Sequence, residues 1–425
     1  MTTRTIVQLE SFYPQVLQSL YQRLPQLAEQ SFDTQLAQML ATGFSGGHNV
    51  APYMNPAQWR SQYIVLNGVA AQQRWAIEHG LSAHAPARDI VLAQLRHYQP
   101  DVLYLSDIPG FDFSILAELS KRPFVVGWHA TSVSDRTPWS AFDLVLSGIS
   151  RIREEVLQRG AKAAVRYMPA APAFVATTLT PQRRQGVVFS GSFYGGIHDQ
   201  RAQQFRQLSQ AVSSIGLDIH TPQPFALEAQ DAIRFHPAVF GHDVLSLYAS
   251  HPVVLDSRGN FNLADDGGPR ETSNMRIFEA TRAGSLLLTE FSPNLSDYFE
   301  LGQEIETYRS FDELVDKIRF YCSPDNEAAR QRIADAGLAR VRREHLIEHR
   351  AAQIETILNE YVPKASIQVA VKALPDAFGL RTEAGAERGF VLTATRNSLV
   401  FTMAQAEQLA RHHAGAALYV VCEDE

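Results

Sequence analysis

Two glutamates, Glu271 and Glu279, stand eight positions apart in the stretch of the chain whose residue types best suit chemistry. The second lies in a segment with apolar residues at helical spacing, which Ser273 or Asn274 can cap and Gly284 can end. Free backbone N–H groups at such a helix start suit a diphosphate, and carboxylates suit the hydroxyls of a ribose or a sugar. The pattern therefore predicts a nucleotide-sugar site. Its plainer alternative is an amphipathic helix with exposed glutamates.

A longer frame, Glu-x7-Glu-Ala-x3-Gly-x4-Thr, contains this pair and ends at Thr289. The frame resembles the donor site of retaining glycosyltransferases of the GT-B fold. Residues 274–279 look most like the spore-maturation-protein-type group, also called glycosyl transferases group 1. The resemblance extends over roughly residues 45–360. It implies two Rossmann-like domains facing a cleft, a nucleoside-diphosphate sugar as co-substrate, and neither a cofactor nor a metal ion.

The resemblance also assigns roles on the donor side. Glu279 would bind the ribose hydroxyls through charge-assisted hydrogen bonds, and Glu271 would contact the transferred sugar. The leaving diphosphate would be stabilised by small turn residues, by the helix start and by arginine, namely Gly191, Ser192, Arg201, Ser273, Asn274, Met275 and Arg276. As alternatives, Arg201 pairs with Asp199, or Arg276 pairs with a glutamate of the frame.

The apolar run Phe124–Trp128 predicts a core strand that delivers His129 at its carboxyl end, where ligands bind in open α/β sheets. The segment resembles the strand-His-x-Thr-Ser stretch of GT-B enzymes, in which the histidine faces the transferred sugar. The alternative is a histidine bonded to a nearby backbone carbonyl. Asp107 ends the preceding strand and could orient His129, contact the acceptor, or cap the turn before Pro109. The candidate catalytic residues are therefore His129, Asp107 and Glu271.

A glycine-rich loop resembles the loop between the domains of related enzymes, although here it comes later in the chain than the usual first turn. Its candidate acceptor-side residues are Gly46, Gly47, His48 and Asn49. Trp59 and Tyr63 could line an acceptor groove, but aromatic residues at helical spacing more often belong to a core.

Helices and strands alternate along the chain, which predicts α/β layers with mainly parallel sheets. We expect a helical stretch over 14–41 interrupted at Pro25, and another over 326–361 interrupted at Gly337. The predicted parts are an acceptor-side domain (1–175), a nucleotide-sugar-binding domain (183–345), a helix returning to the first domain (346–364) and a small α+β appendage (365–425). In the appendage, strands are predicted at 367–373, 390–394, 399–401 and 417–422, and a helix at 403–413.

Composition narrows the function classes further. A net charge of −7 does not favour nucleic acid, and no apolar run approaches the ~18–20 residues that span a bilayer. The two cysteines give neither a disulfide framework nor a Cys-rich metal site, and the adjacent Asp265 and Asp266 lack the context of a metal-binding pair. Without an apolar leader, the cytoplasm is the expected location. Peripheral contact with the inner membrane face and a homo-oligomer formed through the appendage stay open.

The sequence therefore predicts a metal-independent, hexosyltransferase-like enzyme that moves a sugar from a nucleoside-diphosphate sugar to an acceptor. The acceptor could be a glycan, a lipid-linked glycan, a protein or a metabolite, and retention of configuration is implied by the resemblance alone. The alternatives are a GT-B nucleotide-sugar epimerase and a non-catalytic GT-B-like binding or scaffold protein.

Overall fold

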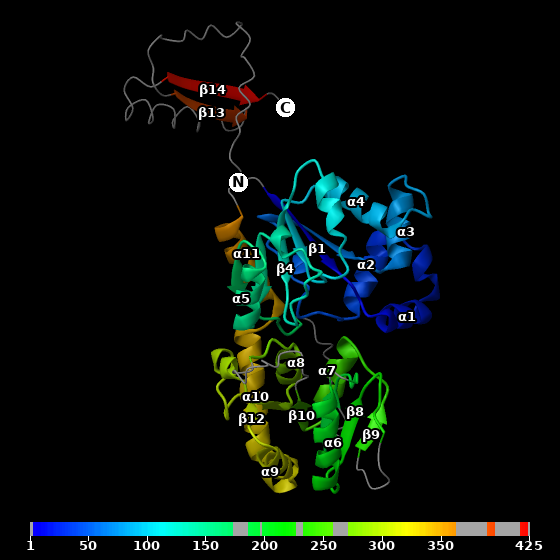
Figure 1. The fold of residues 1–425 in the computed structure, drawn as a ribbon, viewed down its shortest axis with the longest axis vertical. Helices are drawn as coiled ribbons and strands as arrows, with labels where there is room; N and C mark the ends of the chain where they lie inside the picture. The colour runs from blue at the N-terminus through cyan, green and yellow to red at the C-terminus, as the bar shows by residue number, and fades with distance from the viewer. Residues whose placement is uncertain are drawn as a thin grey trace. The chain divides into compact units, whose positions relative to one another are not determined.

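The structure is a computed structural model that describes residues 3–172, 186–195, 198–226, 233–257 and 271–362, together with the strands at 389–395 and 417–423. Contacts divide the chain into two units, Met1–Pro363 and Lys364–Glu425. The first unit contains two six-stranded parallel sheets, each covered by helices, which confirms the predicted α/β fold with two Rossmann-like domains (Figure 1). No helix in these described ranges is both long enough and apolar enough to cross a membrane.

The first sheet has the strand order β2-β1-β3-β4-β5-β6 and is parallel throughout. Successive side chains enter two different cores: Val7 packs with residues of α4 (Ala87–Tyr98), whereas Ile6 packs with residues of α11 (Ile347–Tyr361). Burial on both faces explains the nearly continuous apolar sequence of these strands. They are β1 (Arg4–Glu10), β2 (Trp59–Val65), β3 (Val102–Leu105), β4 (Phe124–Trp128), β5 (Leu144–Ser147) and β6 (Ala164–Arg166).

The helical stretch near the N-terminus is interrupted at Pro25, as predicted, because a short 3-10 helix starting there separates α1 from α2. Trp59 and Tyr63 lie on strand β2 rather than on a helix, and both are buried in the core. The other helices of the domain are α1 (Pro14–Arg23), α2 (Phe32–Ala41), α3 (Val69–Glu78) and α5 (Ser150–Gln158), with 3-10 helices η1 (Pro25–Glu29), η2 (Ala51–Tyr53), η3 (Phe113–Glu118) and η4 (Trp139–Ala141).

The second sheet has the order β12-β11-β10-β7-β8-β9 and is also parallel. Phe205 belongs to the core on one face and Phe278 to the core on the other. Its strands are β7 (Val187–Ser190), β8 (Leu217–His220), β9 (Ile233–His236), β10 (Val253–Asp256), β11 (Leu286–Glu290) and β12 (Glu306–Tyr308). Its helices are α6 (Asp199–Ala211), α7 (His242–Ala249), α8 (Arg276–Arg282), α9 (Phe311–Cys322) and α10 (Glu327–Glu344), with η6 (Pro293–Asp297) and η7 (Pro324–Asn326).

The helix break predicted at Gly337 is wrong. α10 runs unbroken through Gly337, and the chain leaves the helix at His345 before α11 begins. α11 then packs against the first sheet through residues such as Ile354 and Leu358. Gly337 is needed for close packing instead, since a Cβ there would collide with the backbone oxygen of Glu304.

Two strands of the second unit are described, β13 (Gly389–Thr395) and β14 (Ala417–Glu423), which pair in parallel. They confirm the strands predicted at 390–394 and 417–422. The segments predicted at 367–373, 399–401 and 403–413 lie outside the described residues, as does the domain boundary placed between 175 and 183.

Substituting Gly337 tests the close packing of α10. Glycine-to-alanine changes in an exposed helix usually stabilise a protein by about 1 kcal/mol. Gly337→Ala should instead lower the free energy of unfolding by about 1–3 kcal/mol, because the methyl group collides with the Glu304 backbone. Thermal unfolding measures the change. The opposite substitution, Ala339→Gly on the exposed side of α10, is the control for helix propensity alone. A Gly337→Ala protein that melts above the wild type would contradict the packing.

Candidate active site

The predicted motif lies at the carboxyl edge of the second sheet, between β10 and β11. α8 begins at Arg276, whose N–H donates to Asn274 Oδ1 over 2.9 Å, so Asn274 caps this helix. Gly284 follows the helix with a φ of +76°, a conformation that favours glycine, and the chain then enters β11. These local signals fix Glu279 one turn into a short helix.

Glu279 is partly buried and makes no side-chain hydrogen bond among the described residues. Burial raises the pKa of Glu279 to about 7, although the charge of Arg276 acts in the opposite direction. A carboxylate withdrawn from bulk water without a donor is destabilised until donors reach it. Adjacent hydroxyls of a ligand would supply such donors, which separates Glu279 from the exposed glutamate of the plainer alternative.

Arg276 fastens α8 to the sheet. Its guanidinium donates to the Asp256 carboxylate, to the Ser190 carbonyl over 2.5 Å and to the Tyr248 hydroxyl over 3.3 Å. Burial opposes the charge, but Tyr248 and Asp256 outweigh this effect and raise the pKa of Arg276. The pairing considered with a glutamate of the frame is replaced by the pair with Asp256.

Arg201, in the first turn of α6, is buried and donates to the Ser192 carbonyl over 2.9 Å. It forms no ion pair within the described ranges, so it does not pair with Asp199, and its buried Nε has no hydrogen-bond partner there. Burial and the nearby Arg276 lower the pKa of Arg201 to about 10, which leaves the side chain charged at neutral pH.

The two arginines meet at the ring of Phe189. Their guanidinium carbons lie 5.3 Å (Arg201) and 4.8 Å (Arg276) from the ring centroid. Gly191 leaves room for them, because a Cβ there would lie 2.7 Å from the Phe189 ring and 3.1 Å from Arg276 Nη2. Of the carboxylates described, Asp256 alone forms an ion pair with either arginine, so an anionic ligand would balance the remaining charge.

Glu271 joins the two domains. Its carboxylate accepts hydrogen bonds from the backbone N–H of Ser150 and, over 2.6 Å, from the Ser150 hydroxyl. Ser150 begins α5 of the first domain, so Glu271 places its negative charge at the positive end of that helix. Next to it, a Cβ on Gly148 would lie 2.6 Å from the Ser273 hydroxyl. The helix start of the second domain therefore touches the carboxyl edge of the first sheet.

The glycine-rich loop makes a second contact between the domains. A Cβ on Gly47 would collide with the Ala170 oxygen and lie 3.1 Å from Met275 Sδ, and one on Gly46 would lie 3.0 Å from Pro172. Gly47 therefore allows a close approach that no larger residue permits, and Gly46 is tightly packed. This contact brings the predicted acceptor-side loop to the start of α8.

His48 and Asn49 are buried inside the first domain. Burial lowers the pKa of His48 to about 3, so the ring is neutral, and it packs 4.1 Å from the Trp128 ring. Asn49 Oδ1 accepts a hydrogen bond from the Tyr63 hydroxyl over 2.8 Å. These contacts hold the glycine-rich loop against the core of the first domain.

His129 follows β4 as predicted, and its Nε2 lies 3.1 Å from the Ser132 carbonyl oxygen. This is the backbone pairing that was considered as the alternative to sugar contact. Burial lowers the pKa of His129, so the ring is neutral at pH 7. Asp107 does not orient His129: the described hydrogen bonds do not join the two, and the Asp107 carboxylate lies against Gly110 instead.

Glu10, at the end of β1, was not among the candidates from the sequence. It is buried, accepts from the Ser45 hydroxyl over 3.2 Å, and its Oε2 has no partner among the described residues. Burial raises the pKa of Glu10 to about 8. Ser45 has a φ of +55°, a strained conformation of the kind found at functional sites. The signal that could have revealed Glu10 is a carboxylate directly after the first apolar strand.

Comparison with known proteins identifies the second domain. Residues 201–356 match the family described as glycosyl transferase-like. The chain carries a glycosyltransferase domain. A glycosyltransferase from Rickettsia africae has a similar structure, with a TM-score of 0.56 and 9% identity, covering 86% of this chain and 100% of that one. Anabaena Alr3699/HepE in complex with UDP-glucose gives a TM-score of 0.51 and 13% identity, covering 84% and 99%. No curated protein matches the chain.

The similar structures confirm the predicted GT-B fold, and the family match confirms the glycosyltransferase class. The narrower spore-maturation-protein-type grouping stays a prediction. The matched segment contains Arg201, Glu271, Arg276 and Glu279, so the charged donor-side candidates belong to the glycosyltransferase domain itself.

The raised pKa of Glu10 predicts a pH-dependent stability. Between the ordinary pKa of a glutamate and about 8, the folded protein holds a proton on Glu10 that the unfolded chain has released. The wild type should therefore lose about 1 kcal/mol of unfolding free energy per pH unit across this window relative to Glu10→Gln. Urea unfolding of both proteins at pH 5, 6.5 and 8 measures the difference, with Glu29→Gln at an exposed position as control. A difference that does not change with pH would contradict the buried, protonated state.

Proposed function

We propose that this glycosyltransferase binds a UDP-sugar at the carboxyl edge of its second sheet and transfers the sugar to an acceptor held by the first domain. The observation that carries the donor site is the state of Glu279, a partly buried carboxylate with no donor among the described residues. The choice of UDP is supported by the similar fold of Anabaena Alr3699/HepE, which was crystallised with UDP-glucose.

Binding of the diphosphate would use the uncompensated charge beside Phe189. The buried Nε of Arg201 has no hydrogen-bond partner among the described residues, and Arg276 is held in place next to it by Asp256. The backbone N–H groups of Ser273, Asn274 and Met275 donate to nothing in the described part of the chain. These preorganised donors would stabilise the negative charge that develops as the diphosphate leaves.

On the other side of the bond, the first domain would present the acceptor. Glu271 would hold α5 and the motif together while its carboxylate lies next to the transferred sugar. His129, with a neutral ring, and Glu10, with an unpaired oxygen, would contact sugar or acceptor hydroxyls. With retention of configuration, the reaction depends on positioning and leaving-group stabilisation more than on a strong base.

The glycosyl transferase-like match favours transfer over the epimerase and scaffold alternatives. A glycan, lipid-linked glycan, protein or metabolite acceptor stays open at this level. Cytoplasmic location, contact with a membrane surface and oligomerisation through the appendage stay predictions from the sequence.

The donor site is tested by titrating UDP into the full-length protein. Glu279→Gln keeps the shape of the side chain but removes the charge that accepts from two hydroxyls, so the Kd for UDP should rise about tenfold or more. Glu300→Gln, at an exposed position of the same domain, is the matched control. Calorimetry gives both constants. If UDP does not bind the wild type, the proposed function is wrong.

The pKa of Glu279 makes UDP binding depend on pH in a defined direction. Ribose hydroxyls donate to the ionised carboxylate, which is incompletely populated below the raised pKa of about 7. The Kd for UDP should therefore fall by about threefold to tenfold from pH 6 to pH 8. Titrations of Glu279→Gln over the same range remove the contribution of other groups. An equal pH dependence in the variant would show that Glu279 is not the titrating group.

A further inference from the structure

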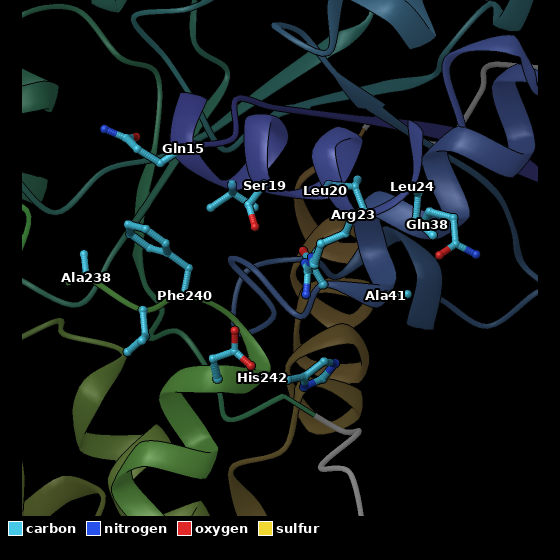
Figure 2. A pocket seen from close by; sticks show the side chains of 14 residues that line it. Gln15, Ser19, Leu20, Arg23, Leu24, Gln38, Ala41, Ala238, Phe240 and His242 are labelled. Carbon is cyan, nitrogen blue, oxygen red and sulfur yellow. The ribbon is translucent and has the colours of Figure 1, made fainter. Parts of the chain in front are cut away.

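A cavity of about 470 Å³ lies between α1 and α2 of the first domain and residues 238–243 of the second. Its size falls in the range of ligand sites. None of its lining residues belongs to α8 or to the turn at Gly191, so it is separate from the donor site. Figure 2 shows side chains of α1, among them Ser19 and Arg23, directed toward the segment that carries Phe240 and His242.

Polar side chains line this cavity without being used by the protein. Within the described ranges, no hydrogen bond or ion pair is made by the side chains of Gln15, Ser19, Arg23, Gln38 or Asp243. The same lining includes the apolar side chains of Leu20, Leu24 and Phe240. A mixture of amides, a hydroxyl, single charges and apolar surface matches the C–H and O–H groups of a sugar ring.

Other ligand classes fit the lining less well. Arg23 is the one lysine or arginine among the described lining residues, and the negative charge of Asp243 offsets it. A polyanion such as a nucleic acid would therefore gain little binding energy from this lining. A lipid chain would leave the five polar side chains without partners. A neutral saccharide needs neither an excess of positive charge nor an entirely apolar lining.

The cavity adjoins the acceptor side of the active site through aromatic rings. Phe240 lies 5.6 Å from the ring of Tyr13 and 6.3 Å from that of Phe44, which itself precedes Ser45. Ser45 donates to Glu10 at the end of β1, whose other carboxyl oxygen has no partner among the described residues. Tyr13 is 57% exposed, so its ring, which contacts both Phe44 and Phe240, also offers accessible aromatic surface.

The walls of the cavity are fixed by close backbone contacts across the two domains. The N–H of His242 donates to the Thr42 carbonyl over 3.0 Å, and a Cβ on Gly43 would lie 2.7 Å from the His242 ring. Gly241 has a φ of +58°, and a Cβ there would collide with the Thr42 oxygen. Because the end of α2 and segment 238–243 are anchored to each other in this way, these two walls of the cavity are preformed in the folded chain.

We propose that this cavity binds the non-reacting part of a saccharide acceptor, so that the acceptor is an oligosaccharide or longer glycan whose reacting end lies at Tyr13 and Glu10. This inference rests on the proposed function and adds the class of acceptor and the place where its chain is recognised.

The test is binding of the full-length protein to an array of oligosaccharides in the presence of UDP. The wild type should bind a set of related glycans. Ser19→Trp, which fills the cavity from an exposed helix position, should weaken that binding about tenfold or more. Gln18→Trp, on the same helix but outside the cavity, is the matched control and should bind like the wild type. Arg23→Ala should weaken binding without adding bulk.

UDP binding, measured by thermal shift, should be the same in all four proteins, since the cavity contributes no residue to the donor site. A wild type that shows no thermal shift with UDP would refute the proposed function rather than this inference alone. With UDP binding intact, two results would overturn the inference: a wild type that binds no glycan on the array, or a Ser19→Trp protein that binds glycans as well as Gln18→Trp does.

Discussion

The buried pair between Arg276 and Asp256 holds the donor side of the structure together. Asp256 ends β10 and also accepts from Asn274 Nδ2 and from the Thr289 hydroxyl, each over 2.9 Å. One carboxylate thus ties the residue that caps α8, the first residue of α8 and the strand that follows the helix. Removing either charge would leave the other buried and unpaired, which costs about 3–5 kcal/mol. The position of Glu279 depends on this pair, because Glu279 lies one turn further along the same short helix.

The pair between Arg276 and Asp256 also explains why the donor side carries an uncompensated positive charge. Asp256 is committed to Arg276, so Arg201 lies beside it as a second buried cation with no carboxylate of its own among the described residues. Between the domains, Glu271 accepts from Ser150 at the start of α5, and Arg166 of the first domain pairs with Asp297 of the second. These bridges align the carboxyl edges of the two sheets, which is where an α/β fold binds ligands. The two domains therefore meet with the uncompensated positive charge at the donor side and the buried Glu10 at the acceptor side.

Features coded by neighbouring residues could be predicted from the sequence. The apolar run Phe124–Trp128 predicted β4, and the cap at Asn274 and the stop at Gly284 predicted the helix that carries Glu279. Partners distant in the chain could not be predicted in this way. Asp256 is 20 residues from Arg276, Ser150 is 121 residues from Glu271, and Glu304 decides the role of Gly337 through space. Glu10 was missed for a related reason, since its burial follows from the loop at Ser45, 35 residues away.

We propose that UDP binds where α8 begins and the turn after β7 ends. Amide hydrogen exchange of the full-length protein with and without saturating UDP tests this directly, because slower exchange reports the segments that the ligand contacts or orders. We predict protection of residues 190–193 and 272–276, with exchange in α3, remote from the motif in sequence, unchanged. Protection that is absent from both segments, or confined to other parts of the chain, would show that UDP does not bind at this edge of the second sheet.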